Sequence, residues 1–171
     1  MQTDEIERLF DEGCRHHDAG LFEAALVCFD RVVTGSPGFA PGHLNRGVAL
    51  QGLGRWQESV MSLSQALALD SGSAAAWNCL GVAMNHLRHF SEAVECLTKA
   101  VALEPGYAMA HNNLGAALRD LRRLDEAISS CPSSSPASTA CLMVCSATTN
   151  SSALPTSMLG LPFASSSVQA P

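Results

Sequence analysis

Four glycines recur at one constant spacing along the chain: Gly13, Gly47, Gly81 and Gly115. A period of about 34 residues is typical of proteins built from stacked helical repeats, because each repeat needs its neighbours to bury its apolar face. A glycine inside a helix costs about 1 kcal/mol relative to alanine. Its recurrence therefore predicts a point where a second helix packs too closely to admit a side chain.

Other residue types follow the same period. A small residue recurs at Ala25, Ala93 and Ala127, a large residue recurs at Phe22, Trp56, Phe90 and Leu124, and proline recurs at Pro37 and Pro105. We expect the small residue to face the glycine from a second helix and the large residue to close the turn between the two. Proline cannot continue a helix, so it marks the end of the second one. The sequence therefore predicts one helical hairpin in each repeat.

These residues resemble the tetratricopeptide-repeat (TPR) family, whose pattern is Trp-x2-Leu-Gly-x2-Tyr, then Ala-x3-Phe, then Pro. The clearest copy in this chain is Trp77-x2-Leu80-Gly81-x2-Met84, Ala93-x3-Leu97 and Pro105. The resemblance implies an all-α fold, a TPR α-solenoid in which antiparallel helix pairs form a right-handed superhelix. It covers residues 4–131, with repeats at about 6–39, 40–73, 74–107 and a truncated 108–131.

The composition changes abruptly inside the fourth repeat. Glu126 is the last charged residue, and Ser, Ala, Thr, Pro, Cys and Leu dominate from Ser129 onward. Cys131 stands where an aromatic residue or leucine should close the hairpin, and Ser134 stands where alanine is expected. A serine- and proline-rich segment without charges is a poor core-former. We therefore expect residues 132–171 to be a low-complexity, disordered tail and the fourth repeat to be left uncapped.

Composition and charge exclude several classes of function. The formal net charge of -6 gives no reason to expect a nucleic-acid partner. No apolar run approaches the ~18 residues needed to span a bilayer, and the stretch from Met1 to Glu7 is polar and acidic rather than a secretion signal. We therefore expect a cytoplasmic protein with neither a membrane nor a nucleic-acid partner. No nucleophile elbow, phosphate loop or dinucleotide fingerprint is present, so we expect no enzyme activity.

The cysteines and histidines give no metal-binding pattern. The chain has seven cysteines but no Cys-x2-Cys pair. Cys28 and Cys96 occupy the same repeat position, which favours packing over a metal or a disulfide. His86 and His89 lie close together in the sequence, but a zinc site there would need further ligands. The sequence therefore predicts neither a metal site nor a cofactor.

Stacked helical hairpins curve so that their first helices line a concave groove. Placing the family's groove positions on this sequence gives a wall of apolar and amide side chains. The amide residues predicted to bind a peptide are Asn45, Asn78, Asn85, Asn112 and Asn113. An asparagine side chain donates and accepts at once, so it suits the backbone of an extended peptide. An alternative interpretation is that these residues are ordinary polar members of the repeat consensus.

Two resemblances within the TPR family bear on the choice of partner. Asp11, Asn45, Cys79 and Asn113 follow the same period as the glycines and resemble, with interruptions, the asparagine ladder of O-linked N-acetylglucosamine transferases. Chaperone-tail modules use Lys, Asn and Arg to clamp a terminal carboxylate. This chain has Phe10, Cys14, Asn45, Ala75 and Cys79 at the corresponding positions. The clamp is missing, which argues against that class of partner.

Three hypotheses follow. The first is a protein-interaction scaffold that binds an extended peptide or a helix of a protein partner in the concave groove. The alternative is a truncated, substrate-presenting TPR region of an O-linked N-acetylglucosamine transferase-like glycosyltransferase that lacks its catalytic domain. The third is self-association through the uncapped fourth repeat.

Overall fold

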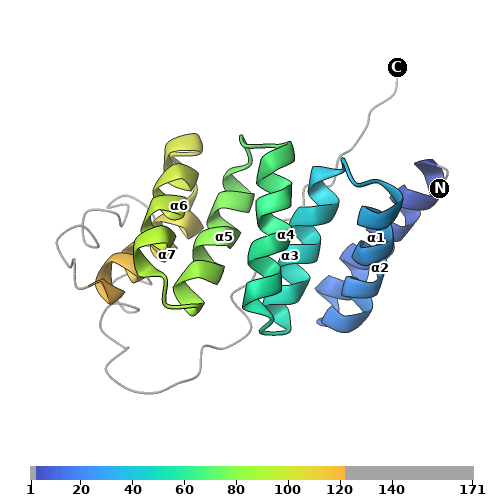
Figure 1. Ribbon diagram of the computed structural model, residues 1–171, viewed down its shortest axis with the longest axis horizontal. Helices are drawn as coiled ribbons and strands as arrows, with labels where there is room; N and C mark the ends of the chain where they lie inside the picture. Colours follow the sequence, from blue (N-terminus) through green and yellow to red (C-terminus); the bar gives the residue numbers. More distant parts are fainter. Residues whose placement is uncertain (1–2, 122–171) are drawn as a thin grey trace.

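The computed structural model describes residues 3–121, which form seven α-helices and no β-strand (Figure 1). The helices are α1 (Thr3–Asp18), α2 (Phe22–Gly35), α3 (Ala40–Gly52), α4 (Trp56–Leu69), α5 (Ala74–His86), α6 (Phe90–Leu103) and α7 (Ala108–Asp120). The predicted all-α class and the predicted pairing into hairpins are confirmed over this range. The second helix expected in the fourth repeat and the tail expected at residues 132–171 lie outside the described residues.

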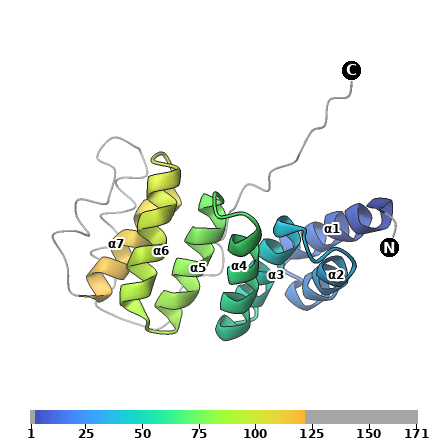
Figure 2. The ribbon, with the colours of Figure 1, turned by 45° about the horizontal axis from the view of Figure 1, so that its top comes forward.

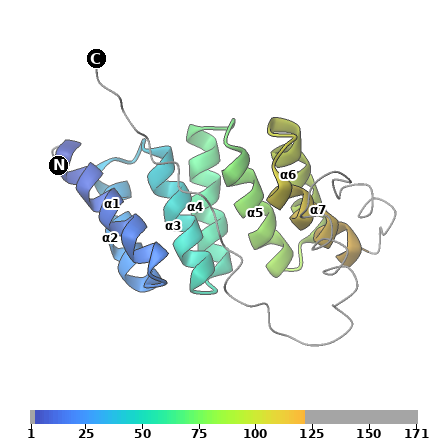
Figure 3. The same ribbon diagram turned by 180° about the vertical axis from the view of Figure 1, so that it is seen from behind.

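The helices stack in one row. The hairpins are α1 with α2, α3 with α4 and α5 with α6, and each following hairpin packs on the one before it (Figure 1). The first helices of neighbouring repeats also contact one another, α1 with α3, α3 with α5 and α5 with α7. Within residues 3–121, the second helices of neighbouring repeats contact one another less than the first helices do. The first helices therefore lie next to one another along one side of a twisted row, which Figures 2 and 3 show from two further directions.

The periodic glycines lie where the two helices of a hairpin touch. A Cβ atom built on each would lie 2.7 Å from Phe29 Cε1 at Gly13, 2.7 Å from Leu63 Cγ at Gly47 and 2.5 Å from Leu97 Cγ at Gly81. Carbon atoms in favourable contact lie about 3.5–4.0 Å apart. A side chain at any of these positions would have to displace the facing side chain of Phe29, Leu63 or Leu97, which confirms the predicted close approach in three repeats.

The second repeat uses serine at a position where the first and third use alanine. Ser59 is fully buried, and its hydroxyl donates a 2.9 Å hydrogen bond to the carbonyl oxygen of Gly47 on the facing helix. Ser62, one turn later, donates to the carbonyl oxygen of His43 at 3.0 Å. Both hydroxyls are satisfied, so the departure from the repeat pattern leaves neither of them unpaired in the core.

Each hairpin turns through the same backbone arrangement. The turn residues Gly20, Gly54 and Arg88 have positive φ angles of 73°, 71° and 65°. The residue after each one donates its N–H to the carbonyl five positions earlier at 2.9 Å, which is the Schellman arrangement of a helix end. Glycine suits this left-handed conformation, whereas a residue with a Cβ is disfavoured there. The backbone conformation of Arg88 therefore destabilises the third hairpin relative to one with glycine at this position.

A side chain near the start of α3, α5 and α7 ties each of these helices to the loop before it. The bonds join His43 Nε2 to the Pro37 carbonyl at 2.9 Å, Trp77 Nε1 to the Ser71 carbonyl at 3.0 Å and His111 Nε2 to the Pro105 carbonyl at 3.0 Å. A carbonyl only accepts, so Nε2 of each histidine carries the donated proton. The histidines therefore reproduce the contact that tryptophan makes in the third repeat.

Apolar clusters span neighbouring repeats and hold the row together. In the largest, Leu63 and Leu67 of α4 pack with Leu80 of α5 and Cys96 of α6, and all four are at most 8% exposed. The second repeat thus supplies one wall of the core that the third repeat closes. This arrangement is expected of a solenoid, in which each repeat buries its apolar face against the next.

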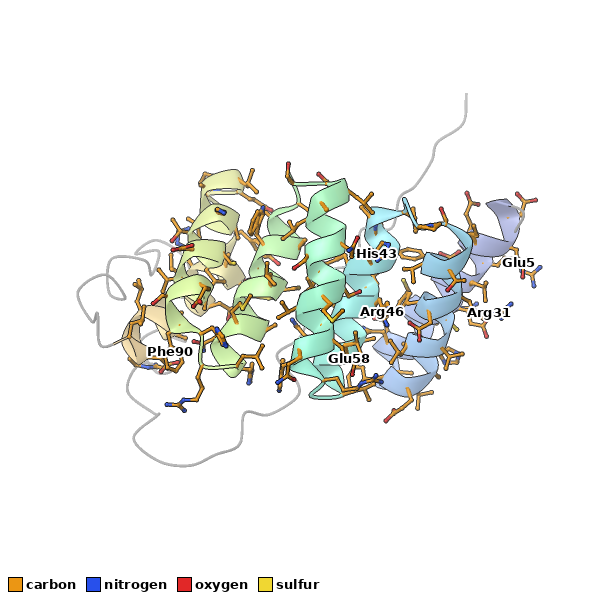
Figure 4. The ribbon with its side chains drawn as sticks, viewed as in Figure 1. Glu5, Arg31, His43, Arg46, Glu58 and Phe90 are labelled. Carbon is orange, nitrogen blue, oxygen red and sulfur yellow. The ribbon has the colours of Figure 1, made fainter. Side chains whose placement is uncertain are left out.

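Ion pairs add a lateral link at the N-terminal end of the row. Arg46 of α3 donates to the carboxylate of Asp30 on α2, with Nε 2.6 Å from Oδ1. Arg31 of α2 lies 3.3 Å from Glu5 of α1, and Figure 4 shows both arginines and Glu5 at this end. These groups are solvent-accessible, so each pair contributes at most about 1 kcal/mol.

Among the described helices, none is long and apolar enough to cross a membrane.

Candidate peptide-binding groove

The five predicted groove residues all lie on first helices. Asn45 is on α3, Asn78 and Asn85 are on α5, and Asn112 and Asn113 are on α7. Their exposure differs: Asn112 is exposed, Asn45, Asn85 and Asn113 are half-buried, and Asn78 is only 2% exposed. The fold thus brings them to one side of the row but presents them unequally to a ligand.

Asn78 joins the third repeat to the fourth. Its Oδ1 accepts a 2.8 Å hydrogen bond from Nδ2 of Asn113. It also bonds to the hydroxyl of Tyr107. Burial, followed by the nearby Cys79 and Glu104, raises the pKa of Tyr107 to about 12, and the bond to Asn78 works against that rise. Asn78 is therefore part of the packed interface between repeats and has little surface for a ligand.

Other amides also join neighbouring first helices. Nδ2 of Asn85 donates to Oδ2 of Asp120 at 3.2 Å, which links α5 to α7. Nδ2 of Asn45 lies 3.8 Å from the sulfur of Cys14, which links α3 to α1. Gln51 of α3, another position expected to face the groove, is buried and donates to the Cys79 carbonyl at 2.7 Å. The amides therefore help to fix the spacing of the groove wall.

The expected amide ladder is discontinuous. Cys79 interrupts it and is 4% exposed, and burial raises the pKa of its thiol to about 12. Cys14, beside the ladder, also has a raised pKa, about 11, through burial and the nearby carboxylates of Asp11 and Asp18. Neither thiol is activated as a nucleophile. Of the five predicted asparagines only Asn112, on α7, is exposed.

A stacked ring pair between α4 and α5 was not expected from the sequence. The indole of Trp56 and the imidazole of His86 have centroids 3.8 Å apart and planes inclined by 5°. Desolvation lowers the pKa of His86. Trp56 follows the period of the large turn-closing residue, so its place in the hairpin was predictable. Its contact with His86 was not, because that contact depends on how α5 sits against α4.

Apolar side chains accompany the amides on the first helices. Each of the four first helices carries one at a position expected to face the groove, namely the half-buried Phe10, Leu44, Val82 and Met109. A wall of this kind offers van der Waals contact and amide hydrogen bonds but few charges. Within residues 3–121, donors suited to a metal ion come together outside this wall, at Glu12, His16 and Cys28.

A family model of the tetratricopeptide repeat matches residues 86–131. This range includes the end of α5 and all of α6 and α7, and the glycine period carries the same pattern through the earlier hairpins. Residues 3–121 therefore have the fold of a tetratricopeptide-repeat array. The matched family is a repeat unit, so it defines the fold of the array and leaves the ligand open.

Solved structures share the TPR fold. The crystal structure of MamA has a TM-score of 0.69 and 25% sequence identity, and the match covers 73% of each chain. The first TPR of Spaghetti (RPAP3), bound to the HSP90 peptide SRMEEVD, has a TM-score of 0.69 and 21% identity over 71% of this chain and 97% of that one. The second TPR domain of human RPAP3, in complex with the HSP70 peptide SGPTIEEVD, has a TM-score of 0.64 and 25% identity over 66% and 94%.

A curated relative is similar in sequence over a shorter stretch. NADPH oxidase activator 1 of Rattus norvegicus is 48% identical over 66 residues, which is 39% of this chain. The match spans 15% of the length of that relative. The similarity is therefore confined to a short segment of a larger protein.

Proposed function

We propose that this TPR array is a protein-interaction scaffold that binds an extended peptide segment of a protein partner along its first helices. The observation that carries the proposal is the amide pair on α7, the exposed Asn112 and the half-buried Asn113, in the same helix as the half-buried apolar side chain of Met109. Amides bind a peptide backbone from both its donor and acceptor sides. The RPAP3 domains, which have this fold, are peptide complexes in two of the solved structures.

The lack of cations at the carboxylate-clamp positions favours a different kind of peptide from those in the RPAP3 complexes. Both of those peptides end in Glu-Glu-Val-Asp. The positions that would hold a terminal carboxylate carry Phe10, Cys14 and Ala75 rather than cations. Lys99, the one lysine of the chain, lies on α6, with its ammonium 4.4 Å from the ring centre of Trp77. We therefore propose an apolar or amide-rich segment as the ligand.

Two further hypotheses from the sequence stay predictions. None of the relatives named above is a glycosyltransferase, so a substrate-presenting role rests on the ladder resemblance alone, which Cys79 interrupts. Self-association through the fourth repeat depends on residues after Leu121, which lie outside the described range. The scaffold proposal needs neither of them.

Peptides selected from a random library on the full chain would test the proposal. We expect Asn112→Ala to weaken their binding by roughly 2- to 10-fold, the value of one hydrogen bond of about 0.5–1.5 kcal/mol, without changing the melting temperature. Binding should vary little with salt, because few charges line the wall. The acidic peptide SRMEEVD should not bind.

Asn78→Ala is the matched control. It removes an amide on a neighbouring first helix, but Asn78 is buried and bonded to Asn113. We expect it to lower the free energy of unfolding by about 1–2 kcal/mol, because a buried hydrogen bond is lost. If Asn112→Ala leaves the affinity of every selected peptide unchanged, the groove on α7 is not the binding surface.

A further inference from the structure

Three side chains of metal-binding type meet on the first hairpin. Glu12 and His16 lie one turn apart on α1 and Cys28 lies on α2, with a ligand atom of each within 4.8 Å of the others. Nε2 of His16 is 3.7 Å from Oε1 of Glu12. Cys28 is only 8% exposed, so packing fixes the position of its thiol. The fold thus brings together donors that the sequence places on two different helices.

The third repeat shows what these positions hold inside the array. The equivalents, two repeats later, are Leu80, Met84 and Cys96, which pack with the preceding hairpin in an apolar cluster. No described helix precedes α1, so the same face of the first hairpin lies at the open end of the row (Figure 2). There the cysteine is kept, while a carboxylate and an imidazole replace the two apolar residues.

Exposure to water accounts for polar residues at an open end, but not for the convergence of three different donors. Zn²⁺ binds thiolate, imidazole and carboxylate, and residues at i and i+4 of a helix lie on one face, as two ligands of one ion must. A thiolate and a carboxylate also balance a double positive charge. We infer that Glu12, His16 and Cys28 form a binding site for a zinc-type divalent ion that joins α1 to α2.

The geometry needs only a small adjustment. Bonds of about 2.0–2.3 Å around a tetrahedral zinc ion place its ligand atoms roughly 3.3–3.8 Å apart. The widest separation in the cluster is within 4.8 Å, and Glu12 is exposed and free to change its rotamer. Three protein ligands leave the fourth position to water. The ion would cross-link the two helices of the first hairpin, which has a described neighbour on one side only.

Titration of the reduced full chain with Co²⁺ tests the site, because thiolate-bound Co²⁺ absorbs in the near ultraviolet. We expect one thiolate-to-cobalt band that Zn²⁺ abolishes by displacement. Cys28→Ser should lose the band. Cys96→Ser is the matched control, since it removes the equivalent thiol in an apolar setting, and it should keep the band. Removing even an outer-shell partner costs about 10–100-fold in metal affinity, so Glu12→Gln and His16→Asn should each weaken Co²⁺ binding at least tenfold.

The outcomes separate a metal site from a merely polar end face. No thiolate band in the wild type overturns the inference, and so does a band that survives in Cys28→Ser, because another cysteine would then be the ligand. If Cys28→Ser does not fold, Glu12→Gln and His16→Asn decide, since both side chains reach the surface. Unchanged Co²⁺ affinity in both variants would show that the cluster does not bind the ion.

Discussion

Gly81→Ala should destabilise the protein even though alanine is the better helix former. The added Cβ would lie 2.5 Å from Cγ and 2.9 Å from Cδ2 of Leu97, and 3.2 Å from the carbonyl oxygen of Ala93. Favourable carbon contacts lie about 3.5–4.0 Å apart, so the overlap with Cγ is about 1 Å. Leu97 is 1% exposed, and the Ala93 carbonyl belongs to the α6 backbone. The buried Leu97 side chain has little space to shift into, and the Ala93 carbonyl can move only with α6.

The magnitude follows from two opposing effects. Overpacking a tight core costs about 1–3 kcal/mol, and the upper part of that range applies because the closest atom is a branch carbon rather than a mobile tip. Replacing glycine by alanine inside a helix favours the folded state by about 1 kcal/mol. We therefore expect a net loss of about 1–2 kcal/mol in the free energy of unfolding, measured by urea denaturation followed by far-ultraviolet circular dichroism.

Two comparisons isolate the cause of that loss. Gly106 lies in the loop after α6, where a Cβ would have no heavy atom within 4 Å and φ is not positive. Gly106→Ala should therefore be neutral or stabilising by up to about 1 kcal/mol. In a Leu97→Ala background the facing Cγ is gone, and Gly81→Ala should cost little or nothing. Wild-type stability for Gly81→Ala would show that the close-approach reasoning is wrong.

Two further predictions concern the turns and the pH dependence. Arg88→Gly should raise the free energy of unfolding by up to about 1 kcal/mol in the same urea assay, because glycine tolerates the φ of 65°; a loss of stability would mean that the contact of Arg88 with the Phe90 ring outweighs the backbone cost. Burial lowers the pKa of His17 from its usual 6.5, against the raising effect of Asp18, so the folded state binds fewer protons than the unfolded state. The stability that His17 contributes is present above pH 6.5 and is lost as the pH falls through the folded-state pKa. Melting temperatures between about pH 8 and about pH 5, which bracket the ordinary histidine pKa of about 6.5, should therefore fall more steeply for the wild type than for His17→Asn, and parallel curves would contradict this.

The repeat architecture could be predicted from the amino-acid sequence. Gly13, Gly47 and Gly81 recur at one spacing because each occupies the same contact in its own hairpin, and the structure shows that contact at all three. Helix ends, turns and small positions depend on interactions within a single repeat, so they recur with the period and can be read from the chain. The tail and the second half of the fourth repeat, predicted from composition, stay predictions.

Whether a groove side chain is exposed to a ligand depends on contacts between neighbouring repeats. The sequence period does not predict those contacts. Asn78 and Asn112 occupy the same repeat position, yet the first is 2% exposed and the second is exposed. The convergence of His16 with Cys28 likewise could not be predicted from their spacing. A period fixes a residue's place within its own repeat, but burial and partners also depend on the neighbouring repeat. Asn78 is buried because α7 packs against α5 and Asn113 donates a hydrogen bond to it. Glu12 and His16 lie instead on a face of α1 that no other repeat covers within the described residues.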